Sequence, residues 1–164
     1  MKEEQGFDVF ITALAVFVAV AVNFMLVYTT ENVNEWLILG VMIINSLMAL
    51  IFLFCKLVTE IDKDGIRVRF FPFLLKEKYF EWKDIEYAYI REYKPLREYG
   101  GWGVRYGKGK SGRAYNTKGK IGLQLQFLDG KKLLIGTQIP NDIELYLNNL
   151  YHENIVKRPA DIED

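Results

Sequence analysis

Two stretches decide the fold of this 164-residue chain: VFITALAVFVAVAVNFMLVY at residues 9–28 and WLILGVMIINSLMALIFLFC at residues 36–55. Neither stretch contains a charged residue. An α-helix of about 20 residues is about 30 Å long, which is enough to cross the hydrocarbon core of a bilayer. Helices of this length in soluble proteins normally carry a polar stripe, and neither stretch has one. We therefore predict a hairpin of two transmembrane helices.

A cleavable signal peptide is the competing interpretation of the first stretch, because Ala19-Val20-Ala21 has the form of a cleavage site. Two features oppose it. The leading segment MKEEQGFD is net acidic, whereas a signal peptide begins with basic residues, and the apolar stretch continues past the supposed cut to Tyr28. The first helix is predicted to be a permanent anchor.

The distribution of lysine and arginine predicts the orientation of this hairpin. The connecting segment TTENVNE, residues 29–35, contains two glutamates and no basic residue. Basic residues lie outside the hairpin instead: Lys2 before it, and Lys56, Lys63, Arg67 and Arg69 after it. Both termini are predicted to be cytoplasmic, with Tyr28 and Trp36 in the outer aromatic belt.

Polar residues inside the two stretches have two interpretations. Asn23 and Asn45 could belong to an ion or substrate path, as polar groups at membrane depth often do. Two helices alone cannot enclose a path, and asparagine side chains bond across helices, so a structural role is the stronger prediction. Ala15 and Ala19 offer a face for close approach, and Cys55 is expected to be an inert boundary residue rather than an acylation site.

From Leu57 onward, the apolar period changes to that of strands. Asp64-Gly65 and Asp129-Gly130 lie between alternating runs and predict hairpin turns, so the sheet should be antiparallel. After Gly136 the pattern becomes helical, beginning near Pro140. The expected inward residues are Ile66, Val68 and Phe70; Ile85, Tyr87 and Tyr89; Leu123, Leu125 and Phe127; and, in the helix, Ile143, Leu147 and Leu150.

Strands followed by one helix are the order of a pleckstrin-homology-like (PH-like) barrel. The chain also resembles bacterial PH-like domains that follow two membrane helices, in EWKDI (residues 81–85), YGGWGVRYG (99–107) and AYNTKGKIGLQLQFLDGKKLLIGTQIP (114–140). The resemblance covers Leu57 to about Leu150 and implies a mostly antiparallel β barrel closed by one C-terminal α-helix, in a bacterial inner membrane. The predicted parts are a helical hairpin at 1–56, a PH-like domain at 57–151 and a fraying polar tail at 152–164.

Catalytic and metal-binding motifs are weak throughout. A phosphate loop ending at Ser111 would need glycine where Val104 stands, and a calcium loop starting at Glu60 would need a ligand where Phe71 stands. Cys55 and His152 are the only cysteine and histidine, so His152 is expected to be a surface residue. We predict no catalytic residues, no metal site, no cofactor and no enzymatic activity.

The stretch from Lys94 to Lys120 is the remaining candidate. It contains eight basic residues against one acid, Glu98, and it lies in a chain of zero formal net charge. A solvated, glycine-rich hairpin is one interpretation, and contact with the anionic inner leaflet is another. Nucleic acid is disfavoured, since no recognition helix accompanies the charges. The candidate contact residues are Trp102, Arg105, Lys108, Lys110 and Arg113.

The hypothesis that follows is a noncatalytic, membrane-anchored PH-like module that organises anionic lipid or protein partners. Eukaryotic PH domains hold inositol phosphates with basic residues in the first hairpin loop, but here Asp62 and Asp64 would repel a phosphate. That binding mode is therefore not expected. The alternatives are a scaffold that assembles with its own copies, or an accessory subunit of a membrane transporter or enzyme.

Overall fold

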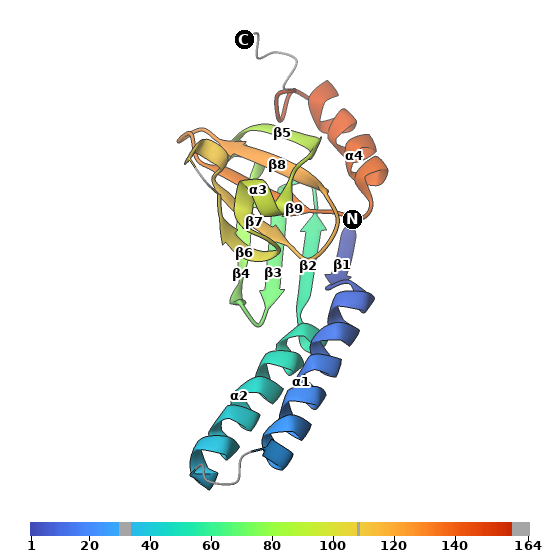
Figure 1. Cartoon of the computed structure of the whole chain (residues 1–164). Coiled ribbons are helices and arrows are strands. Elements are labelled where there is room, and N and C mark those ends of the chain that lie inside the picture. Colours follow the sequence, from blue (N-terminus) through green and yellow to red (C-terminus); the bar gives the residue numbers. More distant parts are fainter. Residues whose placement is uncertain (30–33, 108, 159–164) are drawn as a thin grey trace. The chain divides into compact units, whose positions relative to one another are not determined.

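The computed structural model describes residues 1–29, 34–107 and 109–158. The chain divides into two compact units (Figure 1). One unit is helical and comprises Gly6–Cys55, and the other is rich in β-strands. This second unit combines Met1–Gln5 with the chain from Lys56 onward. It therefore contains the segment before the helical hairpin and the segment after it.

The helical unit consists of α1 (Val9–Thr29) and α2 (Glu35–Phe54), which pack against each other. Asn34 begins α2, and its side chain accepts a hydrogen bond from the Trp36 backbone N–H at 2.9 Å. Ala19 is the one buried residue within 9–28, and no residue of α2 is buried. A core helix of a soluble protein would be mostly buried, so these are two helices long and apolar enough to span a membrane.

Asparagine side chains join the two helices. Asn45 Nδ2 donates to the Ala19 carbonyl at 3.0 Å and to Asn23 Oδ1 at 3.2 Å, while Asn23 Nδ2 donates to Ser46 Oγ at 3.1 Å. Ala19, which has no bulky side chain, lies at this close approach. These bonds confirm the structural role predicted for Asn23 and Asn45.

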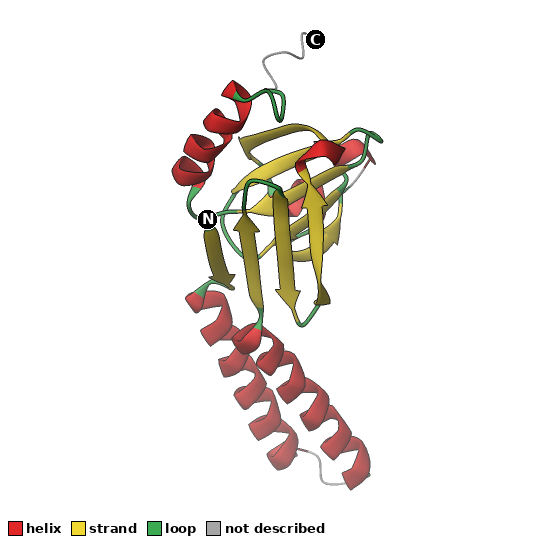
Figure 2. Cartoon of the chain, turned by 180° about the vertical axis from the view of Figure 1, so that it is seen from behind, coloured by secondary structure: helices red, strands yellow, loops and turns green. Residues whose placement is uncertain are grey.

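In the described part of the chain, nine strands form two sheets. The four-stranded sheet has the order β1-β2-β3-β4, which Figure 2 shows side by side, and the five-stranded sheet has the order β5-β8-β9-β7-β6. The strands of the first sheet are β1 (Lys2–Gly6), β2 (Lys56–Ile61), β3 (Gly65–Phe71) and β4 (Leu74–Glu81). Those of the second are β5 (Ile85–Glu92), β6 (Gly103–Tyr106), β7 (Arg113–Asn116), β8 (Ile121–Phe127) and β9 (Lys132–Gly136).

The sheets correct three expectations. The predicted antiparallel arrangement holds for most pairs, but β7 and β9 run parallel, with Arg113 opposite Leu133. The described strands form two separate sheets, without closure into one barrel. In β5, an irregularity between Ile85 and Tyr87 shifts the inward face, so that Ala88 is buried and Tyr87 is not. A local β-bulge of this kind changes which side chains face the core.

Both predicted Asp-Gly hairpins are present. Asp62 Oδ1 accepts hydrogen bonds from the backbone N–H groups of Asp64 and Gly65, at 3.0 and 2.9 Å, and turns the chain from β2 into β3. Gly130 has a φ of 81° between β8 and β9, a conformation that glycine adopts without strain. The carboxylate of Asp62 therefore stabilises the backbone of the β2–β3 turn.

The strand β1 is an element that the sequence did not predict. Met1 exchanges two backbone hydrogen bonds with Ile61 of β2, at 2.6 and 2.8 Å. Glu3 accepts hydrogen bonds from the Thr137 hydroxyl at 2.8 Å and the Gln138 N–H at 2.7 Å, and Gln5 Nε2 donates to the Gly136 carbonyl at 2.7 Å. The polar segment before α1 thus belongs to the β-rich unit.

The helical hairpin is therefore inserted between two neighbouring strands. The chain passes from β1 into α1, and from α2 into β2. Counting along two antiparallel strands from the pair Met1 and Ile61 places Gly6 opposite Lys56. Both connections to the hairpin thus leave from the same end of the same sheet.

Helix α4 (Pro140–His152) closes the β-rich unit, with Ile143, Leu147 and Leu150 buried as predicted. His152 is exposed, also as predicted. The tail does not begin at the end of this helix, however. Val156 is buried, and the Lys157 N–H donates to the Glu86 carbonyl at 3.1 Å, so residues 153–158 pack back on β5. The remaining tail residues lie outside the described part of the chain.

Candidate binding surface at the β6–β7 hairpin

The predicted contact residues lie on and beside the hairpin of β6 and β7, at one edge of the five-stranded sheet. The basic stretch forms α3 (Pro95–Tyr99), β6, the 3₁₀ turn η2 (Gly109–Ser111) and β7. Arg105 and Arg113 are exposed, and Trp102 is half-buried, with its indole N–H donating to the Gly119 carbonyl at 3.2 Å. Lys108 and the side chain of Lys110 lie outside the described residues.

Buried polar residues fasten this hairpin to the domain. The Tyr99 hydroxyl donates to the Ser111 carbonyl at 3.0 Å and so holds η2. Asn116 is fully buried; its Oδ1 accepts from the Gly103 N–H at 2.9 Å, and its Nδ2 donates to the Tyr93 hydroxyl at 3.0 Å. An unpaired buried amide would be destabilising, so these bonds favour one position of the two strands. The hairpin is a fixed part of the domain.

Glu98, the single acid of the basic stretch, does not neutralise its exposed charges. Its carboxylate accepts from the Arg91 guanidinium at 2.8 Å and from the Lys94 N–H at 2.7 Å. Burial opposes ionisation, but these hydrogen bonds prevail and lower the pKa of Glu98 below its usual range. Its charge is matched to Arg91, which lies on β5 outside the basic stretch.

The two arginines of the hairpin are available for a partner. Among the described side chains, no carboxylate lies within ion-pair distance of Arg105 or Arg113. Arg105 Nε donates to the Trp102 carbonyl at 2.8 Å. The Arg113 guanidinium lies 5.1 Å from the ring centre of Tyr106, which is itself 71% exposed. The surface thus presents two guanidinium groups, that of Arg105 beside Trp102 and that of Arg113 over the ring of Tyr106.

An open hollow of about 200 Å³ adjoins Arg113. Aromatic rings form one part of its lining: Phe80 of β4 and Phe127 of β8, whose centres are 5.5 Å apart, and the buried Tyr115. Basic residues form the other part, namely Arg113, Lys131 and Lys132. Of these three, Lys131 is paired with Asp129 at 2.6 Å. The hollow therefore combines apolar walls with unneutralised positive charge.

Of the residues that line this hollow, the sequence predicted only Arg113 as a contact residue, and it predicted Phe127 to face inward. Phe80 lies on β4, whereas Tyr115 and Phe127 lie on the consecutive strands β7 and β8, and no local sequence pattern relates the three residues. The adjacent lysines after the second Asp-Gly turn, Lys131 and Lys132, were a usable signal, since they extend the positive charge beyond Lys120. Register in the folded sheets brings these residues together.

The hollow lies at one end of the four-stranded sheet. Phe80 pairs with Ile66 at the start of β3, whereas Lys56, the first residue after the helical unit, pairs with Phe71 at its end. Phe71 lies five residue steps along the strand from Ile66, a distance of about 17 Å. The hollow is therefore at the opposite end of β3 from the point where the chain enters the β-rich unit.

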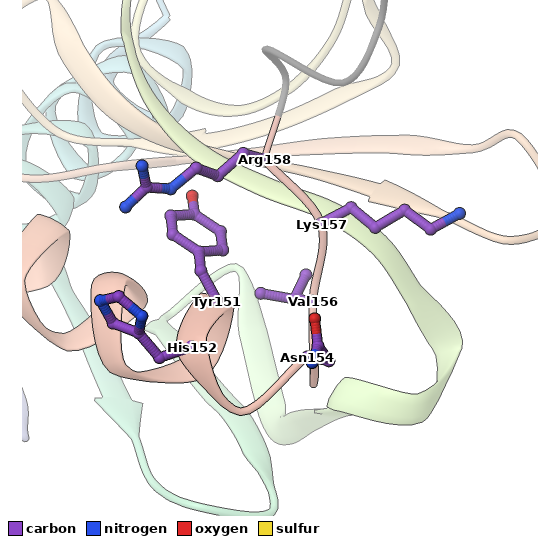
Figure 3. Close-up of a pocket in the computed structure, with 6 residues that line it drawn as sticks. All are labelled: Tyr151, His152, Asn154, Val156, Lys157 and Arg158. Atoms are coloured by element: carbon purple, nitrogen blue, oxygen red, sulfur yellow. The ribbon is translucent and has the colours of Figure 1, made fainter.

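A second hollow, of about 390 Å³, lies at the end of α4 (Figure 3). Its side chains diverge: Lys157 and Arg158 extend in opposite directions, and Arg158 lies over the Tyr151 ring at 4.7 Å. The Tyr151 hydroxyl donates to the Ala88 carbonyl, and burial raises the pKa of this phenol to about 12. Tyr151 is thus a structural donor that remains protonated at neutral pH.

Groups suited to metal binding do not gather anywhere in the described residues, since no three histidine, cysteine, aspartate or glutamate side chains come together. Cys55 is a free, buried cysteine. The absence of catalysis and of cofactors stays a prediction. What the described surface presents beside the β6–β7 hairpin is a set of cations next to aromatic walls.

No protein-family model matches the chain, and no curated protein sequence matches it significantly. The resemblance to bacterial PH-like domains therefore stays a prediction. Its coarser content is present: two long apolar helices precede a β-rich domain that ends in a helix.

Proposed function

We propose that this chain is a noncatalytic, membrane-anchored module of PH-like type that holds an anionic protein partner at the cytoplasmic face of a bacterial inner membrane. The hollow beside Arg113 carries the proposal, because Arg113 and Lys132 flank aromatic walls and neither forms an ion pair with a carboxylate of the described residues. The expected ligand is an acidic peptide segment with one large apolar side chain. The apolar group would occupy the hollow, and the carboxylates would meet the cations.

Anchoring is supported by the exposure and composition of the helices. Large apolar side chains cover α1 and α2, among them Phe17, which is 68% exposed, and Ile44, which is 66% exposed. Exposure of such an apolar surface to water is strongly unfavourable, whereas its exposure to lipid is not. The cytoplasmic orientation follows from the basic residues that border the hairpin on its terminal side.

A protein partner is favoured over lipid for this surface by its position. The hollow lies about 17 Å along β3 from the level of Lys56, where the chain leaves the helical unit. Electrostatic attraction to a leaflet fades over a Debye length of about 8 Å at physiological salt. Aromatic residues and arginine, which this surface combines, are also enriched at protein interfaces.

The test uses the full chain in nanodiscs of neutral lipid and two short fluorescent peptides. One peptide alternates glutamate and serine around a central phenylalanine, and the other has alanine in place of phenylalanine. Fluorescence anisotropy should show binding of the phenylalanine peptide, with Arg113→Gln and Lys132→Gln each weakening it about tenfold, equivalent to about 1.4 kcal/mol. Lys63→Gln, which changes an exposed lysine in the β2–β3 turn, is the matched control.

Three outcomes would contradict the proposal. Equal binding of both peptides would show that the hollow takes no apolar group. Unchanged binding of the phenylalanine peptide by the Arg113→Gln variant would show that the charge of Arg113 does not contribute to binding. If the nanodiscs instead capture added vesicles of anionic lipid and neither peptide, the surface is a lipid contact, and Trp102 and Arg105 become the residues to replace.

A further inference from the structure

The turn between β3 and β4 exposes two phenylalanines. Phe71 is 49% exposed and Phe73 is 47% exposed, with Pro72 between them. Phe73 is held in place, because its ring packs edge-on against the fully buried Phe70 at a centre distance of 5.4 Å. A rigid, exposed aromatic turn is a feature that a stable soluble surface does not need.

Strand register defines where this aromatic turn lies on the sheet. Phe71 is paired with Lys56, and Lys56 comes two residues after Phe54, the last residue of α2. At the same end of the sheet, β1 finishes at Gly6, three residues before α1 begins at Val9 (Figure 2). Two residues of chain span at most about 7 Å, so Lys56, the partner of Phe71 in the sheet, lies within that distance of the last residue of α2.

Basic side chains accompany the aromatic turn. Lys56, Arg69 and Lys76 are exposed beside it, and Glu77 is the acid that pairs with one of them, Arg69, at 3.3 Å. Arg69 and Phe71 are two residues apart on one strand, so they project from the same face. Aromatic rings with flanking lysine and arginine are the composition found where proteins meet the headgroup region of a bilayer.

We infer that Phe71 and Phe73 enter the headgroup region of the bilayer that α1 and α2 cross, and that Lys56, Arg69 and Lys76 contact its anionic phosphates. The inference rests on the membrane anchoring proposed above and not on the peptide partner. It gives the domain a third membrane contact besides the two chain connections.

Fluorescence quenching by spin-labelled lipids tests this contact in the full chain. Single cysteines are placed in a Cys55→Ala background, labelled with an environment-sensitive fluorophore and reconstituted into vesicles. Phe71→Cys reports the aromatic turn, and Lys63→Cys, in the turn at the other end of the same strands, is the matched control. Leu14→Cys, on the exposed surface of α1, reports the anchor.

The fluorophore at position 71 should lose emission with a spin label at headgroup depth, while the one at position 63 should not. The fluorophore at position 14 should lose emission with a spin label deep in the acyl chains. Quenching at 14 without quenching at 71 overturns the inference and leaves the anchor intact, whereas no quenching at 14 removes the anchor itself. A blue shift at 71 that grows with protein concentration and ignores the lipid labels would assign the turn to a second copy of the chain.

Discussion

At the scale of single residues, Gly112 controls how the candidate surface is built. It stands between η2 and β7 with a φ of +74°, and a Cβ there would lie 2.2 Å from the Lys132 carbonyl oxygen. Gly109, in the same turn, has a φ of +61° and open space where its Cβ would be. Both positions therefore require a left-handed backbone, but only Gly112 also lacks space for a side chain.

We expect Gly112→Ala to lower the free energy of unfolding by about 2–3 kcal/mol and Gly109→Ala by about 1 kcal/mol, because only the first combines backbone strain with a steric clash. Urea titration of the detergent-solubilised chain, followed by tryptophan fluorescence, measures both. Equal losses in the two variants would mean that β7 moves away from Lys132 without penalty.

At the scale of elements, local and distant signals differ in what they reveal. The two Asp-Gly turns and the alternation in β3 were predictable, because each depends on residues within one turn or one strand. The strand β1 was not, since its residues are mainly polar and Glu3 and Gln5 are satisfied by bonds to Thr137, Gln138 and Gly136. The hollow was missed for the same reason, as its walls meet only through sheet register.

The contribution of β1 can be measured with two neighbouring glutamates. Glu3 is 8% exposed and accepts two hydrogen bonds, whereas Glu4 is exposed and forms a surface pair with Lys2 at 3.4 Å. Glu3→Ala should lower the free energy of unfolding by about 2–3 kcal/mol, since the buried Thr137 hydroxyl and the partly buried Gln138 N–H lose their acceptor, and Glu4→Ala by less than about 1 kcal/mol. Thermal unfolding monitored by circular dichroism compares them. Matching melting temperatures would show that β1 is not part of the folded domain.

At the scale of the whole molecule, the insertion of the helices between β1 and β2 gives the anchoring a specific form. Both connections are short: Phe7 and Asp8 join β1 to α1, and Cys55 joins α2 to β2. Because both ends of the hairpin join one sheet, we expect the two connections and the β-rich unit to lie on one side of the predicted membrane.

Cysteine labelling tests this topology. Asn32 belongs to the segment without basic residues and lies outside the described residues. In a Cys55→Ala background, the cysteine of Asn32→Cys should react with an impermeant maleimide in intact spheroplasts. Lys63→Cys, in the β2–β3 turn, should react only after lysis. The opposite pattern would invert the orientation that the positive charges predict.

The position of β1 also has a consequence for biosynthesis. This strand leaves the ribosome before the two helices, yet its neighbour β2 is synthesised only after residues 7–55. Closing a flexible loop of that length costs about 3 kcal/mol in chain entropy, by the (3/2)RT ln n relation. When α1 and α2 pair, they bring Gly6 and Lys56 together and remove most of this cost. We therefore expect the helices to pair before β1 joins β2 in the sheet.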